Sequence, residues 1–152
     1  MAIRFYSKSE EYSWLSNFSA HPLRIDGVTW PSVEHYYQAQ KYEDPAVIKR
    51  IRETPSALQA RKAGQDRSLQ ARPDWETAKT DVMRKAIGVK FTQHLSLRRR
   101  LLDTGEETLI HESQSDVFWG SGPDDQGLNM LGIIIMEVRA ELARGQKKSP
   151  GI

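Results

Sequence analysis

The sequence contains no cysteine among its 152 residues. A chain without thiols cannot build a disulfide framework, a thiolate nucleophile or a cysteine-ligated zinc or iron–sulfur centre. Long apolar runs are missing too, because the longest, residues 133–136, is far too short to span a bilayer. The first residues also lack the continuous apolar segment of a signal peptide. We therefore expect a cytoplasmic protein that does not enter a membrane.

The excess of one sign of charge is small as well. The formal net charge is only +2, so the chain as a whole is not a polycation. Positive residues are nevertheless concentrated between Lys49 and Arg72 and in the run Arg98–Arg100. Such local basic surface suits a phosphate or a nucleic acid, although a solvated helix face is its commoner origin. Both interpretations stay open at this point.

Prolines, glycines and capping residues divide the chain into short segments with helical patterns. A length of 152 residues favours one domain. Helices are expected where a polar capping residue or a proline precedes an apolar pattern, and glycines mark their ends. The predicted helices are residues 31–42, those that start at Asp44-Pro45 and Thr54-Pro55, residues 75–91 after Asp74, residues 92–103 and residues 131–143, with Gly64 and Gly105 as stops.

Extended structure is predicted mainly near the amino terminus. Asp26-Gly27 is a favourable two-residue turn between two short strands. The predicted strands are Ile3–Tyr6, Leu23–Ile25, Val28–Trp30 and Thr108–His111. The expected fold class is therefore mainly α (α+β), a single helical domain with a small N-terminal β element. It should occupy residues 1–145, followed by a flexible tail over residues 146–152.

A first candidate for chemistry lies in the aromatic-rich segment Trp30–Tyr42. On a helix, Glu34, Gln38 and Lys41 stand at positions i, i+4 and i+7 and share one face. That face combines an acid, an amide and a cation beside several Trp and Tyr side chains. The alternative is the solvent face of an amphipathic helix, and spacing alone does not decide between them.

A second candidate begins at Trp75, which shares a predicted helical face with Lys79. Trp75 stands in the first turn, where backbone N–H groups can bind an anion. A core anchor at the start of a helix is the more common role for such a tryptophan. Further along the same helix, Lys90 adds another cation.

A third candidate is the loop Glu112–Asn129, which is rich in Gly, Ser, Asp and Asn. Asp116 lies three residues before Trp119 and is followed by Gly120, and the loop leads into a helix whose start could hold a phosphate. The alternative is an Asp-capped turn with Trp119 packed below it. No Walker loop, HExxH, GxSxG or GxGxxG pattern occurs, which disfavours those site types. We expect neither a metal nor a cofactor.

Four blocks of the sequence, taken in order, resemble the NADAR family, also called YbiA-like. The resemblance covers most of the chain, and Tyr42 stands where phenylalanine is usual. The blocks are Phe5-Tyr6 with Leu15–Phe18, then Trp30–Tyr42, then Trp75 with Lys90-Phe91, and finally Asp116–Gly120 with Gly127–Gly132. The resemblance implies a mainly helical fold with a minor sheet and an N-glycosidase. Known substrates of the family are phosphoribosylamino-pyrimidine intermediates of riboflavin synthesis, and some members remove ADP-ribose from modified guanine.

Cleavage of a ribose C1–N bond passes through a cation-like sugar, which a carboxylate can stabilise. Glu34 is the first choice for this role and Asp116 the second. A lysine such as Lys90 could instead attack C1 if its pKa were strongly lowered. Residues expected to bind substrate are Asn17, Gln38, Lys41, Trp75, Lys79, Trp119, Gly120 and Asn129. The partner is then a small phosphoribosyl or ADP-ribosyl compound, or ADP-ribosylated nucleic acid.

Two other classes of function use the same features. A non-catalytic module could bind ADP-ribose or a related nucleotide through these aromatics and cations without turnover. A nucleic-acid-binding domain could use the run Arg98–Arg100, and its binding would depend steeply on salt.

Overall fold

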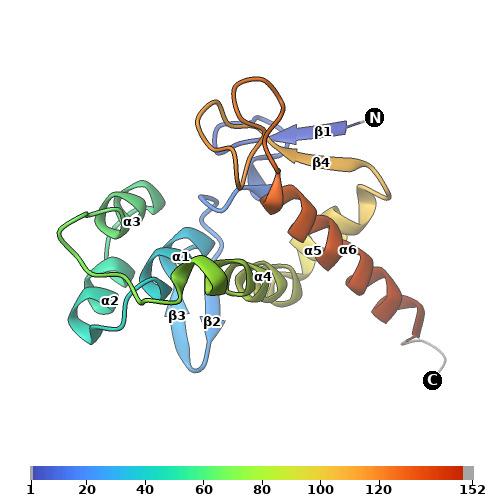
Figure 1. Cartoon of the computed structure of the whole chain (residues 1–152). Coiled ribbons are helices and arrows are strands. Elements are labelled where there is room, and N and C mark those ends of the chain that lie inside the picture. The colour runs from blue at the N-terminus through green and yellow to red at the C-terminus, as the bar shows by residue number, and fades with distance from the viewer. Residues whose placement is uncertain (1, 149–152) are drawn as a thin grey trace. The chain divides into compact units, whose positions relative to one another are not determined.

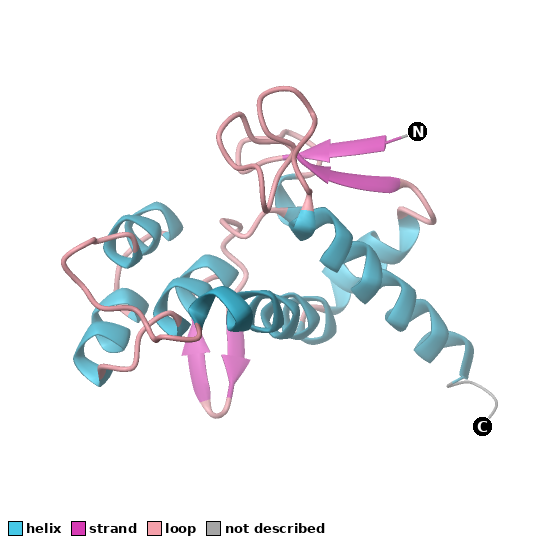
Figure 2. Ribbon diagram, in the orientation of Figure 1, coloured by secondary structure: helices cyan, strands magenta, loops and turns pink. Residues whose placement is uncertain are grey.

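The computed structural model describes residues 2–148, which form six α-helices, one 3-10 helix and four short strands (Figures 1 and 2). The prediction of a mainly helical fold with a small β element is confirmed. The elements are β1 (Ala2–Phe5), η1 (Ser13–Leu15), β2 (Leu23–Ile25), β3 (Val28–Trp30), α1 (Val33–Gln40), α2 (Pro45–Arg52), α3 (Ala57–Gly64), α4 (Trp75–Gln93), α5 (Leu95–Asp103), β4 (Thr108–His111) and α6 (Met130–Lys148).

The chain divides into two compact units. We call residues 17–90 the central unit, and residues 1–16 together with 91–152 the terminal unit. The central unit contains the β2–β3 hairpin, helices α1 to α3 and most of α4. The terminal unit contains β1, β4, α5 and α6. That residues 1–145 form one domain stays a prediction.

The central unit is organised around α1. Ser32 caps this helix, since its Oγ accepts a hydrogen bond from the His35 backbone N–H. The His35 ring lies between Ser32 Oγ, 2.7 Å from Nδ1, and the Thr54 carbonyl, 3.0 Å from Nε2. Burial lowers the pKa of His35, so the neutral ring is favoured. These contacts give His35 a structural role, and α2 and α3 both pack on α1.

The hairpin before α1 forms as the sequence predicts. Asp26 and Gly27 have φ angles of 51° and 78°, which suit a two-residue turn, and Leu23 pairs with Trp30. Trp30 is buried and meets the Tyr36 ring edge-on at 5.4 Å. The buried apolar residues of this unit include Leu23, Ile25, Trp30, Val33, Tyr36, Ala39, Val47, Ile51, Ala60, Met83, Ala86 and Ile87.

The terminal unit pairs its first strand with a strand that comes late in the sequence. β1 runs parallel to β4, with Ile3 opposite Leu109, and α6 packs on β4. Phe5, Leu109 and Ile134 are fully buried in this unit. The predicted strands therefore form two separate two-stranded sheets, β1–β4 and β2–β3, within the described residues.

Several predicted helix boundaries were wrong. α3 starts at Ala57 with Ser56 as its cap, because Thr54 Oγ1 bonds the Ile51 carbonyl at the end of α2. α4 begins at Trp75 as predicted, and it ends at Gln93 rather than Phe91. The Asp74 carbonyl accepts from the Ala78 N–H at 2.9 Å, while the Asp74 carboxylate pairs with Arg72. α5 begins at Leu95 rather than residue 92.

The last helix also differs from the prediction. α6 continues through Gly145 to Lys148, so this glycine does not end it. The rest of the predicted tail, residues 149–152, lies outside the described residues. Gly105, in contrast, has a φ of 63° just after α5, as expected for a helix stop.

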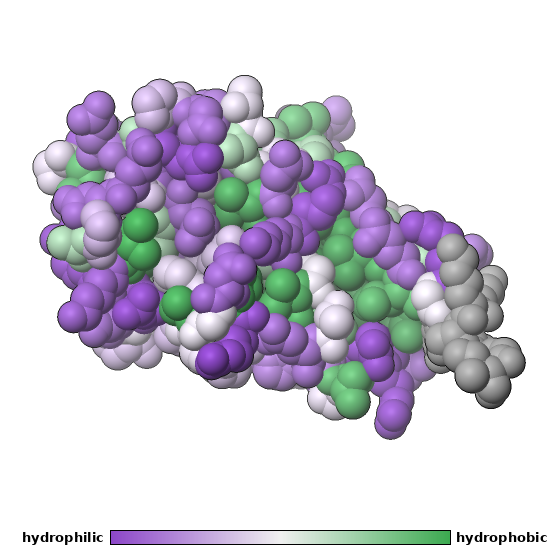
Figure 3. All heavy atoms as spheres, turned by 90° about the horizontal axis from the view of Figure 1, so that it is seen from below, coloured by the Kyte–Doolittle hydropathy of each residue, from purple (hydrophilic) through white to green (hydrophobic). Residues whose placement is uncertain are grey.

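The surface mixes hydrophilic and hydrophobic side chains. On the face drawn in Figure 3, green hydrophobic patches are separated by purple hydrophilic residues. Along the described residues, we find no helix that combines the length and apolar character needed to cross a membrane.

Candidate active site

The polar stripe of α1 is buried, which decides against the solvent-face alternative. Glu34 is 7% exposed and Gln38 is 4% exposed. Gln38 Nε2 donates a hydrogen bond of 2.8 Å to Glu34 Oε2. A buried carboxylate needs such donors, because its charge loses the stabilisation that water provides. The stripe therefore presents an acid and an amide that are already joined to each other.

Lys41, at the end of α1, is half-buried in a group of alternating charges. Burial lowers the pKa of Lys41, while Glu34 and Glu76 raise it and Lys79 lowers it. Lys79 Nζ in turn lies 2.8 Å from Glu76 Oε1. The Glu76 side chain is 81% exposed and that of Lys79 only 17%, so Lys79 is much less solvated than its partner. Two cations near one buried carboxylate are suited to an anionic ligand.

Trp75 packs inside the central unit. Its ring centroid lies 5.1 Å from that of Tyr37, and only 6% of the residue is exposed. These contacts make it a core anchor at the start of α4, as the alternative interpretation held. Whether it also stacks on a base stays a prediction.

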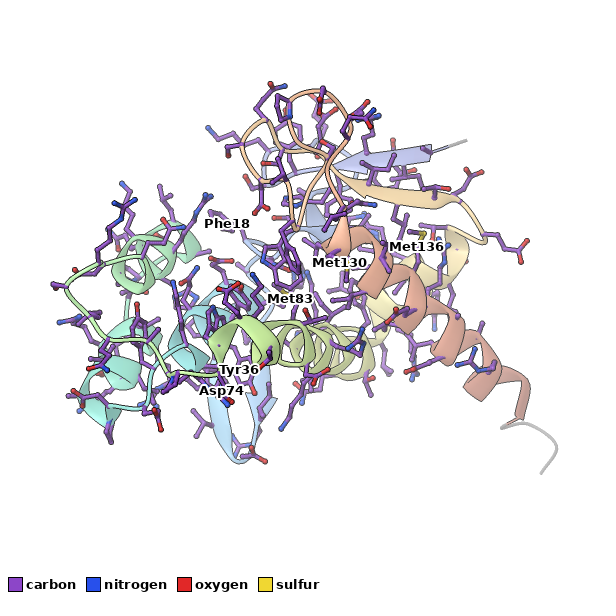
Figure 4. The ribbon with its side chains drawn as sticks, viewed as in Figure 1. Phe18, Tyr36, Asp74, Met83, Met130 and Met136 are labelled. Carbon is purple, nitrogen blue, oxygen red and sulfur yellow. The ribbon has the colours of Figure 1, made fainter. Side chains whose placement is uncertain are left out.

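The segment Asn17–Ser19 forms hydrogen bonds with residues of both α1 and α4. The Asn17 carbonyl accepts a bond from the Glu34 backbone N–H at 3.2 Å, and Asn17 Nδ2 donates to Met83 Sδ at 3.4 Å. Met83 projects from α4 (Figure 4). Two residues along, Ser19 Oγ accepts from Lys90 Nζ at 2.8 Å. Asn17 and Ser19 are two residues apart and can be separated by at most about 7 Å. The groups that contact Glu34 and Lys90 therefore lie close together on this segment.

Lys90 is the most unusual titratable residue of the central unit. It is 1% exposed, and burial lowers its pKa from 10.5 to about 7. Lys90 is therefore neutral in a large fraction of the molecules near pH 7. A lowered lysine pKa is the condition under which this residue can act as a nucleophile.

The Glu112–Asn129 loop of the terminal unit uses many of its polar groups to hold its own fold. Asp116 Oδ1 accepts from the backbone N–H groups of Phe118 and Trp119 at 3.0 and 2.8 Å. The Phe118 and Trp119 rings meet edge-on at 4.7 Å. Gly120 allows close packing, because a Cβ there would lie 3.0 Å from the His111 carbonyl oxygen. This is the Asp-capped turn of the alternative interpretation.

Asn129 ties this loop to β4. Its Oδ1 accepts from the His111 N–H at 2.8 Å, and its Nδ2 donates to the Leu109 carbonyl at 2.9 Å. The N–H groups of Met130 and Leu131 donate to loop carbonyls at 3.0 and 3.1 Å. The expectation that the start of α6 offers N–H groups to a phosphate was therefore wrong, because the loop carbonyls already occupy these donors.

The predicted site residues thus fall into two sets. The central unit contains Asn17, Glu34, Gln38, Lys41, Trp75, Lys79 and Lys90. The terminal unit contains Asp116, Trp119, Gly120 and Asn129. The structure links Glu34 directly to Gln38 and, through charge, to Lys41. Convergence of the two sets in one pocket stays a prediction.

Three residues that the sequence did not indicate contact the predicted site residues of the central unit. Ser19 bonds Lys90, Gly64 bonds Lys41, and Glu76 bonds Lys79. The spacing of Glu76 and Lys79, three apart on a helix, could have revealed their pair. The other two contacts join residues far apart in sequence, and no local pattern signals them. In the part of the chain that the structure describes, no three His, Asp or Glu side chains are grouped so as to hold a metal ion.

Comparisons with known proteins agree with the four sequence blocks. The model of the NADAR domain matches residues 4–143, which run through both units. N-glycosidase YbiA of Escherichia coli strain K12 is 45% identical over 141 residues, covering 93% of this chain and 88% of that protein. An N-glycosidase of Nostoc punctiforme is 42% identical over 145 residues, covering 93% of each.

The NMR structure of E. coli YbiA has the same fold. It matches with a TM-score of 0.90 at 43% identity, covering 98% of this chain and 89% of that one. A riboflavin biosynthesis protein of Vibrio vulnificus is 39% identical over 140 residues, which cover 92% of this chain but 38% of that protein. The match there corresponds to part of a longer protein. These findings confirm the resemblance drawn from the sequence.

Proposed function

This chain belongs to the NADAR domain family, and we infer from its relatives that it is an N-glycosidase, a hydrolase that acts on N-glycosyl bonds. We propose that its substrate is a ribose linked through C1 to the nitrogen of a base-like amine. A phosphoribosylamino-pyrimidine of riboflavin synthesis is the first candidate, in keeping with the name of the Vibrio relative. ADP-ribose attached to guanine, free or in nucleic acid, is the second.

The observation that carries this proposal is the buried carboxylate of Glu34 with its amide and cation neighbours. As the C1–N bond breaks, positive charge develops on the sugar, and a poorly solvated carboxylate stabilises it strongly. Water then adds its oxygen to C1, and the departing nitrogen leaves with a proton. Gln38 donates to Glu34 and so holds this carboxylate in a fixed orientation.

The anionic part of the substrate is assigned to the lysines. Lys41 and Lys79 lie in one charge group, where a 5′-phosphate or a diphosphate would replace water around two cations. A contribution of Asp116, Trp119, Gly120 and Asn129 of the terminal unit to the same reaction stays a prediction. Trp119 would stack on the base, and the bonded loop would hold that ring in place.

An alternative mechanism uses Lys90 as a nucleophile. With a pKa of about 7, its neutral amine can bond to C1 while the base leaves and takes up a proton. Water then hydrolyses the sugar–lysine adduct and restores the amine. Cyanoborohydride reduces an imine between Lys90 and the opened sugar to a stable secondary amine, so the mass of the intact protein after turnover would reveal this route as an added, reduced sugar unit.

The deciding experiment supplies the purified protein with both substrate classes and measures released base by mass spectrometry. We expect free base and a sugar with a hydroxyl at C1 from at least one class. Retention of intact ligand without any released base would instead support the non-catalytic binding module. Location in the cytoplasm is part of this proposal and is tested by fractionation of cells that express the protein.

A further inference from the structure

Gly64 occupies a point where a side chain of any size is excluded. It is the last residue of α3, it is buried, and α3 packs on α1. A Cβ on Gly64 would lie 2.2 Å from Gln38 Oε1 and 2.7 Å from Gln38 Cβ. Because the overlap includes Gln38 Cβ, rotating the far end of Gln38 does not relieve it. Glycine is therefore required if α1 and α3 are to keep their distance.

The same contact sets which way the Gln38 amide points. In glycine a hydrogen occupies the Cβ direction, so a Cα–H of Gly64 points at Oε1. Oε1 is buried and accepts no hydrogen bond from the nitrogen and oxygen donors of the described residues. A weak Cα–H···O contact is compatible with this acceptor. With Oε1 on the α3 side, Nε2 faces Glu34 and donates to its carboxylate at 2.8 Å.

The backbone carbonyl of Gly64 acts on two further side chains. It accepts hydrogen bonds from Lys41 Nζ at 3.1 Å and from the Tyr42 hydroxyl. The carboxyl-terminal end of a helix carries partial negative charge, which attracts an ammonium group. A lysine ammonium has three donors, so one bond to Gly64 fixes its direction and leaves others for an anion.

From these contacts we propose that Gly64 is a positioning residue of the N-glycosidase site. Because Gly64 has no side chain, Gln38 Oε1 can lie against its Cα, and the Gln38 amide nitrogen then faces Glu34. The Gly64 carbonyl binds Lys41 Nζ and so fixes the direction of that side chain. The end of α3 thus holds the amide that supports the carboxylate and the cation that binds the anionic group of the substrate. This inference rests on the roles proposed above for Glu34 and Lys41.

The first test is Gly64→Ala, with kcat, KM and the pH dependence of kcat measured on the phosphoribosyl substrate. We expect kcat to fall about tenfold or more and KM to rise, because both Gln38 and Lys41 shift. The acid limb of the kcat profile should move to higher pH, since a carboxylate that loses a donor is protonated more easily. Gly88→Ala is the matched control, because a Cβ there meets nothing within 4 Å. It should keep wild-type kinetics.

Gln38→Met keeps the test decisive if Gly64→Ala does not fold. This change retains an unbranched side chain of similar size and removes the amide donor to Glu34, while Gly64 stays in place. It should reproduce the shift of the acid limb. An unshifted limb in Gln38→Met, or wild-type kcat and KM in a folded Gly64→Ala, overturns the positioning role. A wild type that releases no base from any N-glycoside instead overturns the proposed function itself.

Discussion

Helix α1 and the Glu112–Asn129 loop were both predicted as parts of one site, yet they use their polar groups differently. In the loop, Asp116 and Asn129 bond backbone groups of the loop and of β4. On α1, Glu34 and Gln38 bond each other inside the core of the central unit. The loop motif is thus largely accounted for by local folding, whereas the α1 stripe is not.

This difference bears on how much a motif says about chemistry. Short backbone bonds to a loop aspartate are common wherever a turn must be held. Burying an acid–amide pair costs free energy, because an apolar pair would fill the same space without desolvating a charge. Such a pair in a core therefore suggests a role other than packing. The buried groups of the central unit are therefore the better guide to the reaction. The following predictions test this contrast, from the largest expected effect to the smallest.

The pH dependence of stability should be dominated by Lys90. Its pKa is lowered from 10.5 to about 7 in the folded state, so between these values the unfolded chain binds the proton and the folded chain does not. Stability must then rise with pH across this window, by up to about 1.4 kcal/mol per pH unit. Lys90→Met should flatten that rise, as measured by urea unfolding between pH 7 and 10. Parallel curves for the two proteins would show that Lys90 is not a buried, weakly basic amine.

Gly132→Ala should destabilise the terminal unit strongly. A Cβ there would lie 2.1 Å from the Leu109 carbonyl oxygen, which is backbone and cannot rotate away. We expect a loss of about 3 kcal/mol or more of unfolding free energy. Gly145→Ala, in the same helix with nothing within 4 Å, is the control and should be neutral or slightly stabilising. Equal melting temperatures for the two variants would contradict the close contact inferred between Gly132 and the Leu109 carbonyl oxygen.

Lys41→Met should discriminate between phosphorylated and unphosphorylated ribosides. A lost hydrogen bond between charged groups costs about 1.5–3 kcal/mol, which is roughly ten- to hundredfold in kcat/KM. The loss should appear only with the phosphorylated substrate, since Lys41 has no anion to bind in the other. Lys85→Met, which removes a half-exposed lysine 3.7 Å from Asp26, serves as the control. The same loss on both substrates would remove Lys41 from phosphate binding.

Glu76→Gln should tighten substrate binding slightly. The exposed Glu76 competes with an incoming anion for Lys79, and an exposed ion pair is worth about 0.2–1 kcal/mol. Removing the competing charge should lower KM for the phosphorylated substrate by roughly two- to fivefold and leave kcat unchanged. A higher KM would mean that Glu76 orients Lys79 rather than competing with the substrate.

The parts of the fold that follow local rules were predicted from the sequence. The hairpin turn at Asp26-Gly27 and the stripe of Glu34 and Gln38 on α1 depend on residues only a few positions apart. The site could not be completed in this way. Gly64 meets Gln38 and Lys41 only after α3 has packed on α1, and Ser19 meets Lys90 only across the central unit.

The loop shows the opposite error of prediction. Its glycines suggested close approach of a phosphate, yet Gly127 is needed because a Cβ there would lie 2.3 Å from the Gly120 carbonyl oxygen. Composition cannot distinguish a glycine that admits a ligand from one that admits another backbone segment. Only the fold shows which atom occupies the space.

The central claim is that the α1 carboxylate, rather than the loop carboxylate, acts on the sugar. Its most direct test compares kcat for Glu34→Gln and Asp116→Asn with saturating substrate in one assay. Glu34→Gln keeps shape and helix propensity but removes the charge, so kcat should fall by roughly a hundredfold or more. Asp116→Asn keeps an oxygen that can accept the Phe118 and Trp119 N–H bonds, so kcat should stay within a few fold. An inactive Asp116→Asn beside a Glu34→Gln variant that turns over normally would contradict the account.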